Sequence, residues 1–149
     1  ALETAGIDAI VLSGGFTSRT PFYLFRGARP LAEMIEVEKS RLQRWVLRVA
    51  GARIIREYPF EELFFLPLAR QVRAAVRVPL VLLGGALSLA NLEQAMAEGF
   101  DCVALGRALI ADPELVVRMQ RGEVTRSRCT SCNKCVAEMD RPGGVRCVL

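Results

Sequence analysis

The chain has 149 residues, of which 24% are charged, with a net charge of +4 and no histidine. The absence of histidine excludes Ser-His catalysis, Cys-His catalysis and histidine-bound metals within this stretch. The positive excess is small, spread along the chain and without an aromatic-studded basic groove, so we expect no nucleic-acid partner. No run reaches about 18 apolar residues, so no membrane-spanning segment is predicted.

Residues 1–5 are predicted to be the end of a helix, and the first predicted strand is a buried one over Ile7–Leu12, which ends at Ser13-Gly14-Gly15. A long excursion from Phe16 to Leu66 follows, and it is predicted to contain an amphipathic helix over Leu31–Ala50. The apolar stripe of this helix comprises Leu31, Met34, Ile35, Leu42, Trp45, Val46 and Val49. A basic amphipathic helix can lie on a membrane surface, but more often it packs against its own protein, so we expect no membrane contact.

Strands and helices then alternate. A helix is predicted from Pro67 to Val76, with Leu68, Val72, Ala75 and Val76 facing the sheet. The elements after it are a strand over Val78–Leu83, a helix from a Ser88 cap to Glu98, a strand over Phe100–Leu105, a short helix over Ala108–Ala111 and a helix from Asp112-Pro113 to Arg121. This order indicates an α/β protein with parallel strands.

Two of these strands end in glycine and lead into a helix, at Gly84-Gly85 and at Gly106-Arg107. Backbone N–H groups at such turns suit an anion, and an arginine can add a charge-assisted bond to phosphate. In (β/α)8 barrels a phosphate site often lies in the loops after strands seven and eight. Gly84, Gly85, Gly106 and Arg107 are therefore candidate phosphate-binding residues. The alternative is that the glycines only form turns and that Arg107 is a surface charge.

Four of the five cysteines lie near the end of the sequence. Cys129, Cys132 and Cys135 have the spacing C-x2-C-x2-C, and Cys147 follows. Four thiolates suit a [4Fe-4S] cluster or zinc, and unligated thiols are the third alternative. A disulfide framework is not favoured, because the rest of the chain has the character of a cytoplasmic enzyme. Cys102 lies within a predicted strand and is expected to be a small core residue.

Sequence motifs at the two glycine turns resemble one known family. "LLGG" at residues 82–85 and "EGFDCVALGRALIADPEL" at residues 98–115 resemble the old yellow enzyme and 2,4-dienoyl-CoA reductase family. Its members are FMN-dependent NAD(P)H oxidoreductases on a TIM barrel. The resemblance implies that Gly84, Gly85, Gly106 and Arg107 hold the FMN phosphate. It also implies hydride transfer from NADH or NADPH, through FMN, to a small-molecule enone or enoyl-thioester.

The tail motif "CTSCNKC", with Cys147, resembles the [4Fe-4S] cysteines of one branch of that family. In the family, the catalytic tyrosine and most residues around the flavin ring come from earlier strands. No catalytic residue is therefore assigned in this chain.

The predicted fold class is α/β, namely the C-terminal portion, about three βα units, of a (β/α)8 TIM barrel with a cysteine-rich tail. A whole barrel needs about 250 residues, more than this chain has. Residues 1–122 would form a partial FMN-binding barrel domain with residues 16–66 inserted, and residues 123–149 the tail. An open parallel sheet predicts a homo-oligomer or association with the missing barrel half. The alternatives are another phosphate-binding TIM-barrel enzyme, or a non-catalytic oligomerising partial barrel with a structural metal knuckle.

Overall fold

The computed structural model describes residues 2–15, 19–20 and 22–149. The described chain forms two compact units, each built from two separate segments. The first unit comprises Ala1–Gly14 and Glu61–Arg128, and the second comprises Gly15–Phe60 and Cys129–Leu149. Residues 16–18 and 21 of the predicted excursion lie outside the described residues, as does residue 1 of the predicted barrel domain.

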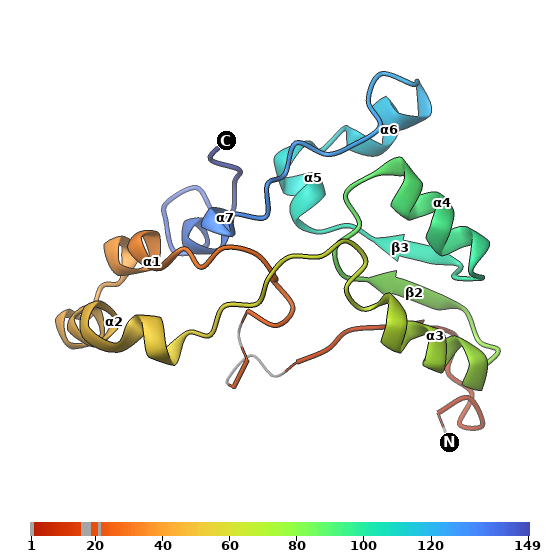
Figure 1. Cartoon of the computed structure of the whole chain (residues 1–149), viewed down its shortest axis with the longest axis horizontal. Helices are drawn as coiled ribbons and strands as arrows, with labels where there is room; N and C mark the ends of the chain where they lie inside the picture. The colour runs from red at the N-terminus through yellow and green to blue at the C-terminus, as the bar shows by residue number, and fades with distance from the viewer. Residues whose placement is uncertain (1, 16–18, 21) are drawn as a thin grey trace. The chain divides into compact units, whose positions relative to one another are not determined.

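The first unit contains a sheet of three parallel strands in the order β1-β2-β3, of which Figure 1 labels β2 and β3. The strands are β1 (Ile10–Val11), β2 (Leu80–Leu83) and β3 (Cys102–Ala104), each shorter than predicted. Their parallel pairing confirms the α/β prediction, whereas the assignment to the C-terminal portion of a (β/α)8 barrel stays a prediction. Leu80 and Leu82 of β2 are only 0% and 1% exposed, which agrees with the apolar run that predicted a buried strand.

Four helices of the first unit follow the predicted order: α3 (Leu66–Ala75), α4 (Leu89–Ala97), α5 (Arg107–Ala111) and α6 (Leu115–Gln120). Ser88 caps α4 as predicted, through a reciprocal capping box with Asn91. The helix α6 begins later than predicted, because Asp112 accepts a hydrogen bond from the Glu114 N–H at 3.1 Å and holds residues 113–114 in a turn.

The core of the first unit lies between the sheet, α3 and α4, and centres on Leu80, Leu82, Ala95 and Phe100. Val72 packs against this core as predicted, but the prediction for Leu68 is wrong because its side chain is 54% exposed. Ala69, one position further along α3, is the buried residue instead, so the face of α3 that meets the sheet is rotated from the predicted one.

The prediction that Cys102 is a core residue is also wrong, because Cys102 is exposed. Successive side chains of a strand point to opposite faces of the sheet. Val103 packs against the core, and its neighbour Cys102 therefore points to the other face.

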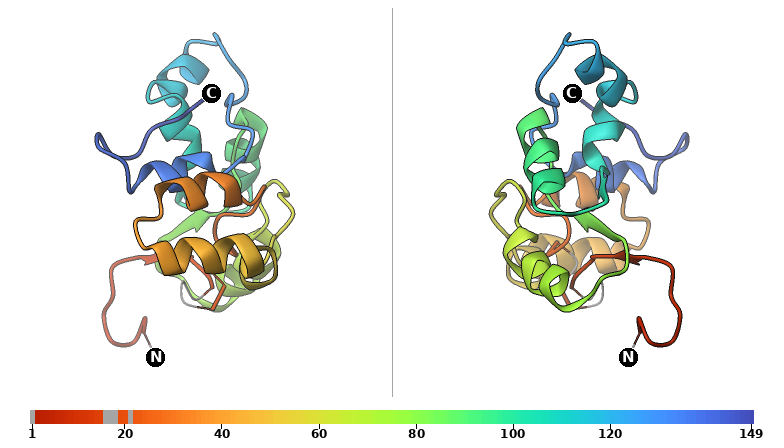
Figure 2. Two further views of the ribbon diagram at one scale, coloured as in Figure 1. Left: turned by 90° about the vertical axis from the view of Figure 1, so that its left-hand side faces the viewer. Right: turned by 90° about the vertical axis from the view of Figure 1, so that its right-hand side faces the viewer.

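The second unit contains α1 (Leu31–Val37), α2 (Arg41–Ile54) and α7 (Lys134–Glu138). α1 and α2 lie side by side (Figure 2). The single helix predicted over Leu31–Ala50 is wrong, because the chain is extended at Glu38 and Ser40. The Ser40 hydroxyl accepts from the Gln43 N–H, and the Glu38 carboxylate accepts from the Ser40 N–H at 2.8 Å, so a new helix starts here.

Candidate functional site

The two predicted phosphate loops lie at one edge of the parallel sheet in the first unit. β2 and β3 pair in register, with Leu83 opposite Ala104 at their carboxyl ends. Gly84-Gly85 follows Leu83 directly, and Gly106-Arg107 follows Ala104 after one residue. Since neighbouring parallel strands end at the same edge, both loops leave the sheet side by side.

Gly84 and Gly85 have a structural role that does not require a ligand. Their φ angles are +114° and +84°, a region that side chains other than glycine rarely adopt. A Cβ on Gly84 would lie 2.7 Å from the Phe65 ring, and one on Gly85 would lie 2.8 Å from the carbonyl oxygen of Glu61. The close packing of the loop at residues 61–65 therefore demands glycine at both positions.

Gly106 is different, because nothing in the structure crowds it. A Cβ added there would meet no atom within 4 Å, and its φ of −102° is accessible to other residues. Open space at this position fits the approach of a ligand to the backbone. Gly106 precedes α5, whose first residue Arg107 is half-buried. The loop therefore meets the steric requirement for holding a phosphate group beside an arginine.

A polar cluster that sequence reasoning missed lies at the start of α4. Glu62 forms an ion pair with Arg126, and both line a pocket of about 570 Å³ with Ser88 and Asn91. Burial raises the pKa of Glu62, but hydrogen bonds from Asn91 and Arg126 outweigh it and leave the pKa below its ordinary value. Glu62 and Arg126 are distant in sequence, and only the capping pattern at Ser88 gave a local signal.

The cysteine loop of residues 129–135 belongs to the second unit and is held by Asn133. Asn133 is 1% exposed, and its side-chain amide donates to the carbonyl oxygens of Phe25 at 2.5 Å and Ala28 at 2.9 Å. The Ala28 N–H in turn donates to the Ser131 carbonyl at 3.1 Å. Ser131 and Asn133 have φ angles of 56° and 60°, so the loop turns sharply twice between Thr130 and Lys134.

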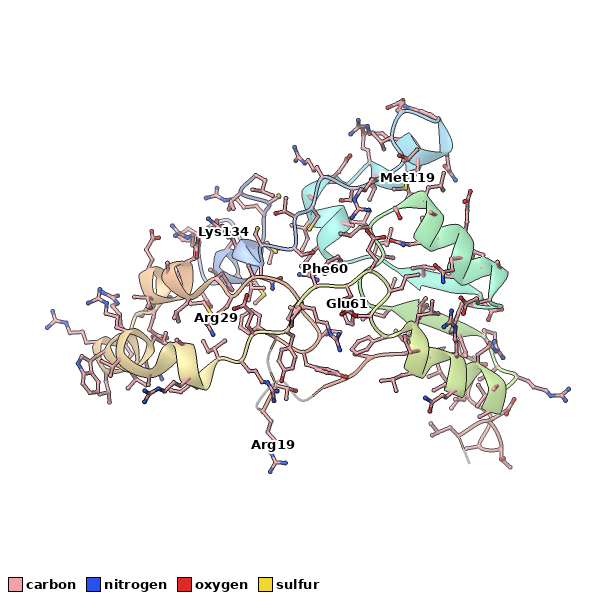
Figure 3. All side chains as sticks on the ribbon, viewed as in Figure 1. Arg19, Arg29, Phe60, Glu61, Met119 and Lys134 are labelled. Carbon is pink, nitrogen blue, oxygen red and sulfur yellow. The ribbon has the colours of Figure 1, made fainter. Side chains whose placement is uncertain are left out.

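Ion pairs hold both ends of α7, on which Cys135 lies. The Lys134 ammonium contacts Glu33 of α1 at 2.9 Å, which raises the pKa of Lys134 and lowers that of Glu33 (Figure 3 labels Lys134). At the other end the buried Glu138 carboxylate forms an ion pair with Arg141 at 2.9 Å and accepts a hydrogen bond from the Arg146 guanidinium at 2.8 Å. Arg146 directly precedes Cys147, so its ion pair with Glu138 connects the segment of Cys147 to α7, which contains Cys135.

The four tail cysteines do not form an assembled metal centre in this structure. The donor chemistry of four thiols fits a [4Fe-4S] cluster or zinc. However, across residues 2–15, 19–20 and 22–149 no three Cys, Asp or Glu side chains are placed to share one metal ion. No disulfide joins the five cysteines, all of which are described. Cys129, Cys132, Cys135 and Cys147 therefore stay predicted ligands.

Comparison with known proteins finds oxidoreductases. The chain is 44% identical over 149 residues to the 4,4'-dithiodibutanoate disulfide reductase of Rhodococcus erythropolis, which covers 99% of this chain and 36% of that protein. It is 35% identical over 89 residues to the bilirubin reductase of Mediterraneibacter gnavus, covering 58% of the chain and 14% of that protein. It is also 37% identical over 76 residues to the NADH oxidase of Thermoanaerobacter brockii, covering 50% and 12%.

The chain therefore spans about a third or less of the length of these relatives. No protein-family model matches the sequence, and no solved structure matches it. In the described part of the chain no helix is long and apolar enough to cross a membrane. The three similarities relate this chain to segments of oxidoreductases.

Proposed function

We propose that this chain is part of an FMN-dependent NAD(P)H oxidoreductase and supplies the site for the FMN phosphate. The observation that carries the proposal is that β2 and β3 end together at the carboxyl end of the sheet, where their paired ends place Gly84-Gly85 beside Gly106-Arg107. The names of the three relatives, two reductases and an NADH oxidase, support redox chemistry with NADH as a donor.

In this site each residue has a separate task. Gly84 and Gly85 shape the first loop, because only glycine fits against Phe64 and Phe65. Gly106 leaves room for phosphate oxygens, and Arg107 supplies a positive charge to them. Bound FMN would take a hydride from NADH or NADPH and pass it to the substrate.

The test compares the binding of two flavins that differ in the phosphate group. FMN and riboflavin share the flavin ring, but only FMN carries the phosphate, so a phosphate site predicts tighter binding of FMN. Flavin fluorescence during titration of the protein measures both affinities. Arg107→Gln should weaken FMN binding by roughly tenfold or more, because a hydrogen bond to a charged group contributes about 1.5–3 kcal/mol. It should leave riboflavin binding unchanged.

Two further variants separate ligand contact from folding. Gly106→Ala should keep the fold, since its Cβ meets nothing, and should weaken FMN binding through overlap with the phosphate. Arg121→Gln, at an arginine whose side chain is 67% exposed, is the matched charge control and should bind FMN like the parent. Equal affinity for FMN and riboflavin, or FMN binding that Arg107→Gln leaves intact, would refute the phosphate site.

We also propose that Cys129, Cys132, Cys135 and Cys147 ligate a [4Fe-4S] cluster or zinc. Their C-x2-C-x2-C spacing supports this proposal. Protein purified without air should contain about four iron atoms, or one zinc, per chain. Replacing Cys132 with serine should remove this metal, and metal-free parent protein would refute the assignment.

Association with a second copy or with the rest of a barrel is a further part of the proposal. The sheet has β1 and β3 at its edges in the described residues, and unpaired edges favour association. Sedimentation that shows a stable monomer would contradict it.

A further inference from the structure

The helix α2 carries an exposed row of large apolar side chains. Leu42 is 70% exposed, Trp45 is 61% exposed and Val49 is 67% exposed. Their spacing of three and four residues places them on one face of the helix. The sequence predicted that this face packs inside the protein, and that prediction is wrong for these three residues.

The second unit fixes which face of α2 points outward. Gly51 is buried on the opposite side, where an added Cβ would lie 2.7 Å from Leu31 of α1. Ser40 caps the start of the helix. At the other end, the Arg29 guanidinium donates to the carbonyl oxygens of Ala52 at 3.1 Å and Ile55 at 2.9 Å. The apolar row is thus presented by a helix held at both ends.

The charge of α2 is entirely positive. Its 14 residues, RLQRWVLRVAGARI, include four arginines and no acidic residue. Arg44 turns back to donate to the carbonyl oxygen of Glu38 at 3.0 Å. The other three arginines, Arg41, Arg48 and Arg53, are exposed. Arg41 and Arg48 are seven residues apart and line one flank of the apolar row, since seven residues make about two turns.

We propose that α2 binds the surface of a membrane that contains anionic lipid, with Leu42, Trp45 and Val49 inserted at the boundary between headgroups and acyl chains. Apolar side chains flanked by arginine are the pattern of helices that lie in the membrane interface. Tryptophan favours this depth, and each arginine near an anionic surface adds attraction. At 14 residues the helix is too short to span a bilayer, so it would lie along the surface.

The charge of α2 favours an anionic membrane surface over a second copy of the chain as its partner. If two copies paired through α2 about a two-fold axis, the same surface would meet itself. The arginines of one helix would then face those of the other across an apolar contact, where like charges repel. An anionic lipid surface meets both the apolar row and the arginines, so it fits the helix better.

The experiment relies on Trp45, because it is the only tryptophan of the chain. Its emission is recorded with vesicles of phosphatidylcholine and with vesicles that also contain roughly a third phosphatidylglycerol. The expected result is a shift to shorter wavelength with the anionic vesicles only, reversed by high salt. Brominated acyl chains in these vesicles should quench the same emission, which shows that the ring reaches the lipid.

One set of variants changes the apolar row of α2 and another changes its arginines, with co-sedimentation as the binding assay. Leu42→Ser with Val49→Ser should lower vesicle binding by at least tenfold. Arg41→Gln with Arg48→Gln should lower it by roughly tenfold or more, from the attraction expected per arginine. The matched control is Leu68→Ser with Arg121→Gln, two exposed positions of the first unit, and it should bind vesicles like the parent.

Three results would overturn the proposal. One is Trp45 emission that is already at short wavelength without lipid and does not respond to vesicles, since another protein surface then covers the helix. Another is a shift without lipid that depends on protein concentration, which indicates pairing of two copies. The last is equal binding to neutral and anionic vesicles, or undiminished binding by the variants of α2.

Discussion

Replacement of Gly27 by alanine should destabilise the second unit much more than replacement of another left-handed glycine in the same unit. Gly27 has a φ of +136° and lies against the cysteine loop. An added Cβ would overlap the carbonyl oxygen of Ser131 and lie 3.0 Å from the Ser131 Cβ. The main obstacle is backbone, held by the Ala28–Ser131 hydrogen bond, so no side-chain rotation can relieve it.

The expected loss of unfolding free energy in Gly27→Ala has two parts, which the control Gly144→Ala separates. The unfavourable φ costs about 1–2 kcal/mol in any residue with a Cβ. Forced overlap in a packed site adds about 1–3 kcal/mol. Gly144 has a φ of +75° but nothing within 4 Å of an added Cβ, so Gly144→Ala should lose only the first part. We therefore expect Gly27→Ala to lose about 2–5 kcal/mol and Gly144→Ala about 1–2 kcal/mol of unfolding free energy.

Urea unfolding followed by Trp45 fluorescence measures this difference, since Trp45 is the only tryptophan and belongs to the second unit. Midpoints are compared at equal m-values, so that the change reports stability. If Gly27→Ala and Gly144→Ala shift the midpoint equally, the cysteine loop does not pack against residues 27–28 and the described arrangement is refuted.

Three further predictions concern the first unit. Asn91→Ala should lower the unfolding free energy of the first unit by about 1–3 kcal/mol, because the N–H groups of Leu87 and Ser88 lose the Asn91 oxygen to which they donate at 3.0 and 3.1 Å. Calorimetry measures this loss, and a value below about 0.5 kcal/mol would contradict the prediction. Leu82→Ala should cost about 2–5 kcal/mol, because Leu82 is 1% exposed, whereas Leu68→Ala at an exposed site should change the unfolding free energy by less than about 1 kcal/mol. Hydrogen bonds from Arg70 and Gln94 lower the pKa of Glu98 to about 2 from 4.5, so its stabilising effect is complete above the ordinary value and declines as pH falls from 4.5 towards 2. Glu98→Gln should therefore lower the melting temperature at neutral pH and approach the parent in acid, and a pH-independent difference would contradict this.

Local signals predicted the first unit well. Ser88 caps the start of α4 and Gly99 follows its end, as expected, because a cap and a left-handed glycine act within a few residues. The alternation of apolar strands and helices predicted the parallel sheet, and from it follows the shared edge of the two glycine loops. The role of Gly84 and Gly85 against Phe64 and Phe65 required the fold, since sequence cannot show what a Cβ would meet.

Other features depend on contacts between distant segments. The apolar residues before and after Glu38–Ser40 keep one helical period, so the break between α1 and α2 was hidden, although Ser40 is a good cap. Periodicity showed that α2 is amphipathic, but not whether another element covers its apolar face. Asn133 followed Cys132 in a recognised motif, yet its burial against Phe25 and Ala28 became visible only in three dimensions.

The anchoring of Asn133 has a consequence for synthesis on the ribosome. Its partners Phe25 and Ala28 lie 108 and 105 positions earlier in the chain. Helices α1 and α2 can pair as soon as they emerge, but their unit cannot close until residue 133 has been translated. Such distant contacts form slowly, because a long loop must be ordered first. During this interval the carbonyl oxygens of Phe25 and Ala28 lack the Asn133 amide that later donates to them, so the second unit forms late in synthesis.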